Sequence, residues 1–282
     1  MRRILKIVPL IVAAVFALGA CGDGTGATDD GASTGATQFP LTIKNCGRDV
    51  TFGAQPERVM TLGPEGATLV AAAGAANKIV ARSTEFGSPL GEYEAQLKEI
   101  KYLSPDKELS KEKIIAQNPD LVIHYGIETQ PEDLEAAGIE SIAAPGRCTP
   151  RGTQGFDDIF GAIELYGRLL GTEDTAEAAG EGLRKRVEAV TEQSRKNPAG
   201  TTAAALIESL LNNDPDVLVL LSQKIGETKT QVKQALLSRK ELRKLKAIKS
   251  DDIIVLFYGD TAGSPVAVEG LEKMAKQLDD LR

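Results

Sequence analysis

Hydrophobic residues from Phe39 onward alternate between short continuous runs and segments with helical spacing. Continuous apolar runs bounded by Gly, Pro or polar residues predict buried strands, and amphipathic segments between them predict helices. Strands that alternate with helices through short loops form parallel sheets. The pattern therefore predicts a hairpin over residues 41–52 and then a doubly wound α/β region, with strands in RVMTLGP, KIVARS, PDLVIHYG and SIAAPG and helices in GATLVAAAGAAN, SKEKIIAQN and QPEDLEAAGI.

The spacing changes between residues 157 and 197. Apolar residues recur there at helical spacing on both sides of Gly171, which predicts a nearly continuous connecting helix. Strands predicted in PDVLVLLS and DDIIVLFYG follow, with a charged helix from about Thr228 to Leu245 and a closing helix in VAVEGLEKMAKQLDDL. We therefore predict a first β/α lobe over residues 39–156 and a shortened second β/α lobe over residues 198–282.

One junction occurs twice in the sequence. Placing Pro119 on Pro215 aligns SKEKIIAQNPDLVIHYG with AALIESLLNNDPDVLVLLS, each a predicted helix that leads through Pro-Asp into a buried strand. This favours two lobes of related topology. Chance similarity is the alternative, because a helix followed by proline and a strand is a common junction.

The first twenty residues have the pattern of a secretory signal peptide. Three basic residues precede the apolar run IVPLIVAAVFALGA, which is short for a bilayer span. The run ends in Leu-Gly-Ala-Cys, which resembles the lipobox of bacterial lipoproteins, so Cys21 is the expected lipidation site. An ordinary cleavage site with an incidental cysteine is the alternative. Residues 21–38 are small and polar and predict a flexible tether, so we expect an exported protein, lipid-anchored on the extracytoplasmic face of the cell membrane.

Charge and motifs narrow the possible functions. The chain has 33 basic and 40 acidic residues, a balance that does not suit nucleic-acid binding. Within residues 39–282, which form the predicted lobes and connecting helix, the nucleophile elbow, the phosphate-binding loop, the dinucleotide fingerprint and the HExxH motif do not occur. The single histidine, His124, leaves no convincing Ser/His/Asp set and no multi-histidine metal site. We predict that the protein is not an enzyme and has no cofactor, no metal site and no nucleic-acid partner.

Apart from Cys21, the chain has an even number of cysteines. With Cys21 committed to lipid, Cys46 and Cys148 remain. An exported chain with two such residues predicts a disulfide between them, and two unpaired thiols are the alternative.

Taken in order, these segments resemble the substrate-binding lipoproteins of bacterial ABC importers for ferric siderophores, haem and cobalamin, in the class with a rigid helix between two lobes. Actinobacterial members look most similar, including the paired cysteines. The resemblance implies a clamp, expected to be monomeric, that captures an iron chelate between its lobes and delivers it to a permease and its ATPase. The chelator, not the protein, would hold the iron. The matching stretches include LTIKNCGRDVTF, PERVMTLGP, SKEKIIAQNPDLVI, DLEAAGIESIAAP, FDDIFGAIELYGRLLGT and LKAIKSDDIIVLF.

Residues that follow the predicted strands are the candidates for ligand contact, because parallel sheets place ligands beyond the carboxyl ends of their strands. Arginine suits the oxygens of an anionic iron chelate, and tyrosine can stack or donate a hydrogen bond. Each candidate also has a structural alternative, as a locally paired arginine, a core or rim tyrosine, or a hydrogen-bonded histidine. The expected contacts are Glu65, Arg82, Ser83, His124, Tyr125, Arg147, Arg151 and Tyr258.

Two departures from the family pattern leave alternatives open. The glutamate that commonly docks on the permease falls at Thr68, with Glu65 the nearest acid, and only AGTTAAALIESLLNN separates the connecting helix from the next strand. A degenerate relative that acts as a surface interaction protein without transport is therefore an alternative. A cobalamin or haem binder is another, although the absence of Trp weighs against flat tetrapyrroles.

Overall fold

The computed structural model describes the chain from Thr37 to Leu281, apart from short gaps. Cys21, Arg151, the predicted signal peptide and most of the tether lie outside the described residues. Within the described part of the chain, no helix is long and apolar enough to cross a membrane. The described residues are 37–105, 107–125, 131–145, 147–148, 155–196, 202–203, 207–222, 224 and 226–281.

The first lobe contains a parallel sheet with helices on both faces, as the sequence predicts. Its strand order is β4-β3-β5-β6, and all neighbouring strands run parallel. Alternate strand residues face two apolar layers, one beneath α1 and α5 and one beneath α3 and α4. The elements are β3 (Val59–Leu62), α1 (Gly66–Ala72), β4 (Ile79–Ser83), α2 (Glu94–Leu97), α3 (Lys111–Ile115), β5 (Leu121–His124), α4 (Pro131–Glu135) and β6 (Glu140–Ala143), with short 3-10 turns η1 (Ala76–Lys78) and η2 (Gly91–Tyr93).

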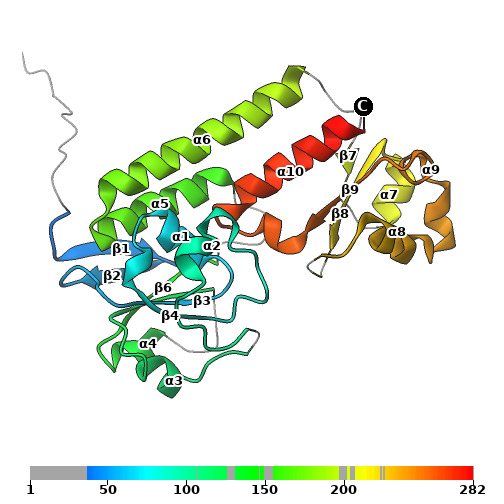
Figure 1. Cartoon of the computed structure of the whole chain (residues 1–282). Coiled ribbons are helices and arrows are strands. Elements are labelled where there is room, and N and C mark those ends of the chain that lie inside the picture. The colour runs from blue at the N-terminus through cyan, green and yellow to red at the C-terminus, as the bar shows by residue number, and fades with distance from the viewer. Residues whose placement is uncertain are drawn as a thin grey trace, which may run out of the picture. The chain divides into compact units, whose positions relative to one another are not determined.

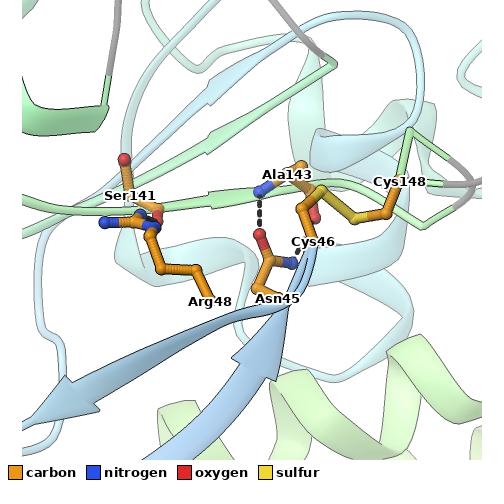
Figure 2. The surroundings of a disulfide bond; sticks show 6 residues. All are labelled: Asn45, Cys46, Arg48, Ser141, Ala143 and Cys148. Carbon is orange, nitrogen blue, oxygen red and sulfur yellow. Dashed lines mark hydrogen bonds between the residues drawn. A yellow bond between two sulfur atoms is a disulfide. The ribbon is translucent and has the colours of Figure 1, made fainter.

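The predicted hairpin and disulfide are confirmed. Strands β1 (Leu41–Asn45) and β2 (Arg48–Phe52) pair antiparallel around Cys46 and Gly47, whose φ angles of 51° and 79° are those that a two-residue type I′ turn requires. Cys46 forms a disulfide with Cys148, 102 residues later in the chain (Figure 2). In the chain-entropy model a closed loop of this length stabilises the fold by about 4 to 5 kcal/mol.

The hairpin turn also pairs the free edge of β6. The Asn45 side-chain amide donates to the Ala143 carbonyl at 2.9 Å and accepts from the Ala143 N–H at 2.8 Å, as Figure 2 shows. Arg48 donates to the Ser141 carbonyl at 3.3 Å. Unpaired backbone groups on an edge strand are a template for unwanted strand pairing, so these side chains protect the edge.

Two helices connect the lobes, α5 (Phe156–Leu170) and α6 (Glu173–Lys196), and they pack against each other. Gly171 lies between them with φ 70°, the left-handed conformation that ends many helices. The segment that the spacing predicts to be one nearly continuous helix therefore changes direction at Gly171, and α6 leads toward the second lobe (Figure 1).

The second lobe is built on a three-stranded parallel sheet, β7-β8-β9, within the described residues. The helix predicted from Thr228 to Leu245 is wrong in extent: α8 ends at Leu237, and extended Arg239 separates it from a 3-10 turn that buries Leu242. The elements are β7 (Thr202–Ala203), α7 (Ile207–Asn213), β8 (Val217–Ser222), α8 (Lys229–Leu237), η3 (Lys240–Lys244), α9 (Lys246–Ser250), β9 (Ile253–Phe257), η4 (Tyr258–Thr261) and α10 (Val266–Asp280).

The repeated junction has the same backbone conformation in both lobes. Asn118 and Asp214, the residues before the two prolines, have φ angles of 52° and 40°, which non-glycine residues rarely adopt. Each junction leads into the strand that lies between two others, β5 or β8. The sheets then correspond as β3 to β7, β5 to β8 and β6 to β9. In the described residues, β4 has no counterpart in the second lobe.

The free edge of β9 is paired in the same way as that of β6. The Gln277 amide of α10 donates to the Val255 carbonyl and accepts from the Val255 N–H, both at 3.1 Å. The corresponding strand of each lobe therefore has its outer edge paired by one side-chain amide.

Salt bridges tie α10 to α6 and to the first lobe. Arg186 of α6 donates to both carboxylate oxygens of Glu272 at 2.8 Å and to Glu92 at 2.9 Å. Glu269 of α10 accepts from the Glu92 N–H at 2.9 Å. Helices α6 and α10 lie side by side (Figure 1). The second lobe is thus attached to the first through the C-terminal helix as well as through α6.

Replacing Gln277 with Glu should lower the free energy of unfolding by about 1 to 3 kcal/mol. A carboxylate cannot donate to the Val255 carbonyl, which would then lose its partner. Chemical denaturation at pH 7.5 measures the change. The control is Gln234→Glu on an exposed position of α8, expected to change stability by no more than about 0.5 kcal/mol. Equal losses in both variants would contradict the edge-pairing role.

Candidate functional site

The carboxyl ends of the four parallel strands bring together the loops that carry three of the predicted contacts, Glu65, Tyr125 and Arg147. Glu65 follows β3, Phe86 follows β4, Tyr125 follows β5 and Arg147 follows β6. We call these four residues the strand-end cluster. Loops at this edge of a parallel sheet are where ligands bind in open α/β folds.

Glu65 and Arg147 form a salt bridge at the base of the cluster. The Glu65 side chain is 4% exposed and the Arg147 side chain is 29% exposed. Burial raises the pKa of Glu65, and the charge of Arg147 and its hydrogen bond offset part of that rise. Among the described residues, Glu65 Oε2 has no hydrogen-bond partner. The pair therefore joins an arginine whose side chain is partly exposed to a buried carboxylate that is incompletely satisfied.

Tyr125 joins Arg147 to Phe86. The Arg147 guanidinium carbon lies 5.5 Å from the centre of the Tyr125 ring, and the Phe86 ring meets Tyr125 edge to face at 5.5 Å. The Tyr125 hydroxyl is 3.4 Å from Glu108 Oε1. Gly63 has φ 106°, and a Cβ there would lie 2.5 Å from the Tyr125 Cβ, so only glycine leaves room for the ring. The cluster presents two aromatic rings and a cation on adjoining loops.

Arg82 and Ser83 are engaged inside the lobe. Arg82 pairs with Glu85 at 2.5 Å, both side chains being less than 10% exposed, and it stacks on Tyr102 at 4.5 Å. Burial raises the pKa of Glu85 to about 7, and the ion pair with Arg82 offsets only part of the rise. Ser83 donates to the Ser104 carbonyl at 3.0 Å. Ligand contact by Arg82 and Ser83 remains a prediction. The contacts that the structure shows for these two residues are with other residues of the first lobe.

His124 is the last residue of β5 and is only 8% exposed. Burial, assisted by the nearby charge of Arg48, lowers the pKa of His124 to about 4. The imidazole is therefore neutral at pH 7 and adds no charge to the site. Its predicted role as a ligand contact stays a prediction.

Tyr258 begins η4 in the second lobe and is 57% exposed. A Cβ on the next residue, Gly259, would lie 2.6 Å from Pro89 Cδ, so this turn packs closely against the loop that carries Phe86. Arg151 lies outside the described residues.

Sequence reasoning missed Phe86. Its side chain is 49% exposed, and both Thr84 and Phe86 have positive φ angles, 61° and 52°. The only available signal was a phenylalanine in the loop TEFGSP directly after a strand.

Thr68 stands where the family resemblance would place the glutamate that docks on the permease. It is buried and donates to the Glu65 carbonyl at 3.0 Å.

The described residues contain no group of three His, Cys, Asp or Glu side chains that could hold a metal ion. The chemistry of the strand-end cluster is hydrogen bonding, charge pairing and aromatic contact. Such a cluster suits the binding of a polar ligand with acceptor oxygens.

Parallel sheets in two lobes, joined by helices α5 and α6, define an α/β fold of two related lobes. The sequence matches the periplasmic binding protein family over residues 59–207, and the chain belongs to that family. This is a family of solute-binding proteins.

Known proteins with similar sequences or structures agree with this family membership. The uncharacterized ABC transporter substrate-binding lipoprotein YvrC of Bacillus subtilis is 26% identical over 214 residues, which cover 74% of this chain. The chain spans 63% of the length of that relative. A crystal structure of an ABC-type Fe3+-hydroxamate transport system from Saccharomonospora viridis is 30% identical, with a TM-score of 0.70 over 85% of this chain and 99% of that one.

A more distant structure shares the fold alone. The periplasmic vitamin B12 binding protein BtuF of Vibrio cholerae is 18% identical, with a TM-score of 0.58 over 80% of this chain and 98% of that one. The predicted two-lobed α/β fold is confirmed by the structure and by these likenesses.

Replacing His124 with Gln should make stability less sensitive to acid. The folded-state pKa of about 4 lies below the ordinary value of 6.5. The stability contributed by neutral His124 is therefore complete above pH 6.5 and is lost as pH falls toward 4. Between pH 7.5 and 5 the wild type should lose about 2 kcal/mol more than His124→Gln in urea denaturation. Because His124 is the only histidine, no other imidazole titrates in this range. Parallel losses in the two proteins would contradict the assigned pKa.

Proposed function

We propose that this protein is the lipid-anchored, extracytoplasmic solute-binding component of an ABC importer, and that it captures a ferric siderophore between its lobes for delivery to the permease. The observation that carries the proposal is the strand-end cluster, where Arg147 is held by Glu65 beside the Tyr125 and Phe86 rings. The chelator supplies the iron ligands, and the protein needs no metal site of its own.

The chemistry of the cluster supports this ligand class. Siderophores present hydroxamate, carboxylate or catecholate oxygens, which accept hydrogen bonds from a guanidinium. Aromatic edges and faces pack against the flat parts of a chelate. Family membership and the likeness to a Fe3+-hydroxamate transport protein point in the same direction.

Two other functions are alternatives to siderophore binding. A cobalamin or haem binder is favoured by the likeness to a vitamin B12 binding protein, but the chain has no Trp, and Phe86 and Tyr125 offer little flat surface for a tetrapyrrole. A surface interaction protein without transport is favoured by the second lobe, whose described residues lack a counterpart of β4.

A ligand panel separates these functions. The mature protein is mixed with iron-loaded hydroxamate, catecholate and carboxylate chelates, with haem and with cobalamin, and the melting temperature and tyrosine fluorescence are recorded. A ligand at 100 times its Kd stabilises the fold by about 2.7 kcal/mol, a readily measured shift. A response to a ferric chelate supports the proposal. A response to haem or cobalamin alone replaces it with a tetrapyrrole binder, and no response to any ligand favours the interaction protein.

Arg147 should determine affinity for the chelate. Arg147→Gln should weaken binding of the responding chelate at least about tenfold, because a donor to charged or strongly polar oxygens is lost. The affinity of Arg147→Lys should lie between those of the wild type and Arg147→Gln, since lysine keeps the positive charge but loses the planar set of guanidinium donors. The control is Arg239→Gln, at an exposed arginine between α8 and η3. Unchanged affinity in a folded Arg147→Gln protein would remove the strand-end cluster from the binding site.

Cys21 should carry the anchor. In a bacterial host that processes lipoproteins, the wild type should fractionate with membranes and Cys21→Ala should be released or remain unprocessed. Cys46→Ser, which leaves the leader intact, is the control and should stay with the membrane. Membrane retention of processed Cys21→Ala would contradict lipid attachment at this residue.

A further inference from the structure

An apolar pocket of about 270 Å³ lies where the first turn of α5 meets the second lobe. It is bounded by the end of β9, the turn η4 and the first half of α10. Figure 1 shows the segment between β9 and α10 at the junction of the lobes. Apolar side chains that line it are Phe156, Ile159, Leu256, Ala267, Leu271 and Met274.

The pocket is suited to an uncharged group. No lysine or arginine lines it among the residues described. Its one carboxylate, Asp260, is already paired, with Lys273 at 2.7 Å and with the Phe257 N–H at 3.3 Å. A charged group that entered would lose water without gaining an unpaired charge of opposite sign, which is unfavourable.

The size of the pocket limits what it can hold. Whole ligands of drug size occupy pockets of roughly 300 to 1,000 Å³. Apolar cavities of about 150 Å³ already stay dry and bind small hydrocarbons. A pocket of about 270 Å³ lies near the lower end of the drug-size range and is large enough for a hydrocarbon chain.

Turn η4 lines the pocket and also packs, through Gly259, against Pro89 in the loop that carries Phe86 of the strand-end cluster. Turn η4 carries exposed Tyr258 at its first residue and lines the pocket with Asp260 and Thr261. The same turn is held firmly on α10, because a Cβ at Gly270 would lie 2.1 Å from the Asp260 carbonyl oxygen. A group bound at Tyr258 therefore has the apolar pocket within the length of the same short turn.

Building on the proposed function, we propose that this pocket binds an aliphatic arm of the iron chelate, so that the ligand is an acylated siderophore with a polar iron-binding head at the strand-end cluster and a hydrocarbon chain between α5 and α10. The pocket contributes affinity through apolar burial, and the cluster contributes the polar contacts. Neither region holds the whole ligand.

The test uses two forms of one linear trihydroxamate, N-acetylated and N-octanoylated, each loaded with iron. They have the same charge and the same iron-binding groups and differ only in chain length. Tyrosine fluorescence gives the two dissociation constants. Because each buried methylene favours binding several-fold, the octanoyl form should bind at least about tenfold more tightly.

Pocket variants locate the effect. Ala267→Leu, with Ala262→Leu as a second filling variant, should abolish the difference between the two chelates, because both positions line the pocket. Ala275→Leu, also on α10 but not lining the pocket, should retain it. Melting temperatures confirm that each variant is folded.

The outcomes distinguish this inference from the proposed function. Equal affinity of the two chelates for the wild type overturns the inference and leaves the proposed function intact. A difference that survives both filling variants also overturns it, because the chain then binds elsewhere. If neither form binds, the inference falls, and the wider ligand panel decides the proposed function separately.

Discussion

The outer edge of a parallel sheet presents backbone groups that need partners, and the hairpin turn at the start of the first lobe supplies them for β6. Asn45 pairs both backbone groups of Ala143, and Cys46 is bonded to Cys148 in the loop that follows β6. Arg147 precedes Cys148, so the same turn that closes the edge also fixes where Arg147 emerges. Glu65, in the loop that follows β3, then pairs with Arg147. Edge protection, the disulfide and the candidate site therefore depend on one another.

Sequence reasoning predicted those features that depend on local pattern or compartment. The alternation of apolar runs predicted the four strands of the first parallel sheet and β8 and β9 of the second, but not β7, and the even cysteines of an exported chain predicted the disulfide. It could not separate Arg147 from Arg82, since both lie near the carboxyl end of a predicted strand, and only tertiary contacts show Arg82 buried against Glu85. Phe86 was missed because its position depends on an unusual backbone conformation rather than on any periodic pattern. The predicted end of the charged helix lies too far along the chain, because the polar pattern continues past Arg239, where the backbone is extended.

The two lobes share a plan but not a complete set of strands. The junctions at Asn118 and Asp214 have the same left-handed backbone, and the amide of Gln277 does for β9 what Asn45 does for β6. A lobe with three described strands buries less apolar surface than one with four, and its independent stability should be lower. Arg186 offsets this by joining α6, α10 and the first lobe through three hydrogen bonds. The second lobe is thus supported from outside its own core.

This dependence on α10 has a consequence for ligand recognition. Helix α10 pairs the β9 edge through Gln277, meets α6 through Glu272, and forms one wall of the apolar pocket through Leu271. Three positions within the seven residues from Leu271 to Gln277 thus fix the sheet, the lobe attachment and the pocket shape. A pocket whose wall is held on two sides is already formed before a ligand arrives, and a preformed site spends less of its interaction energy on ordering side chains. Apolar contact can then add to affinity even though the polar cluster is small.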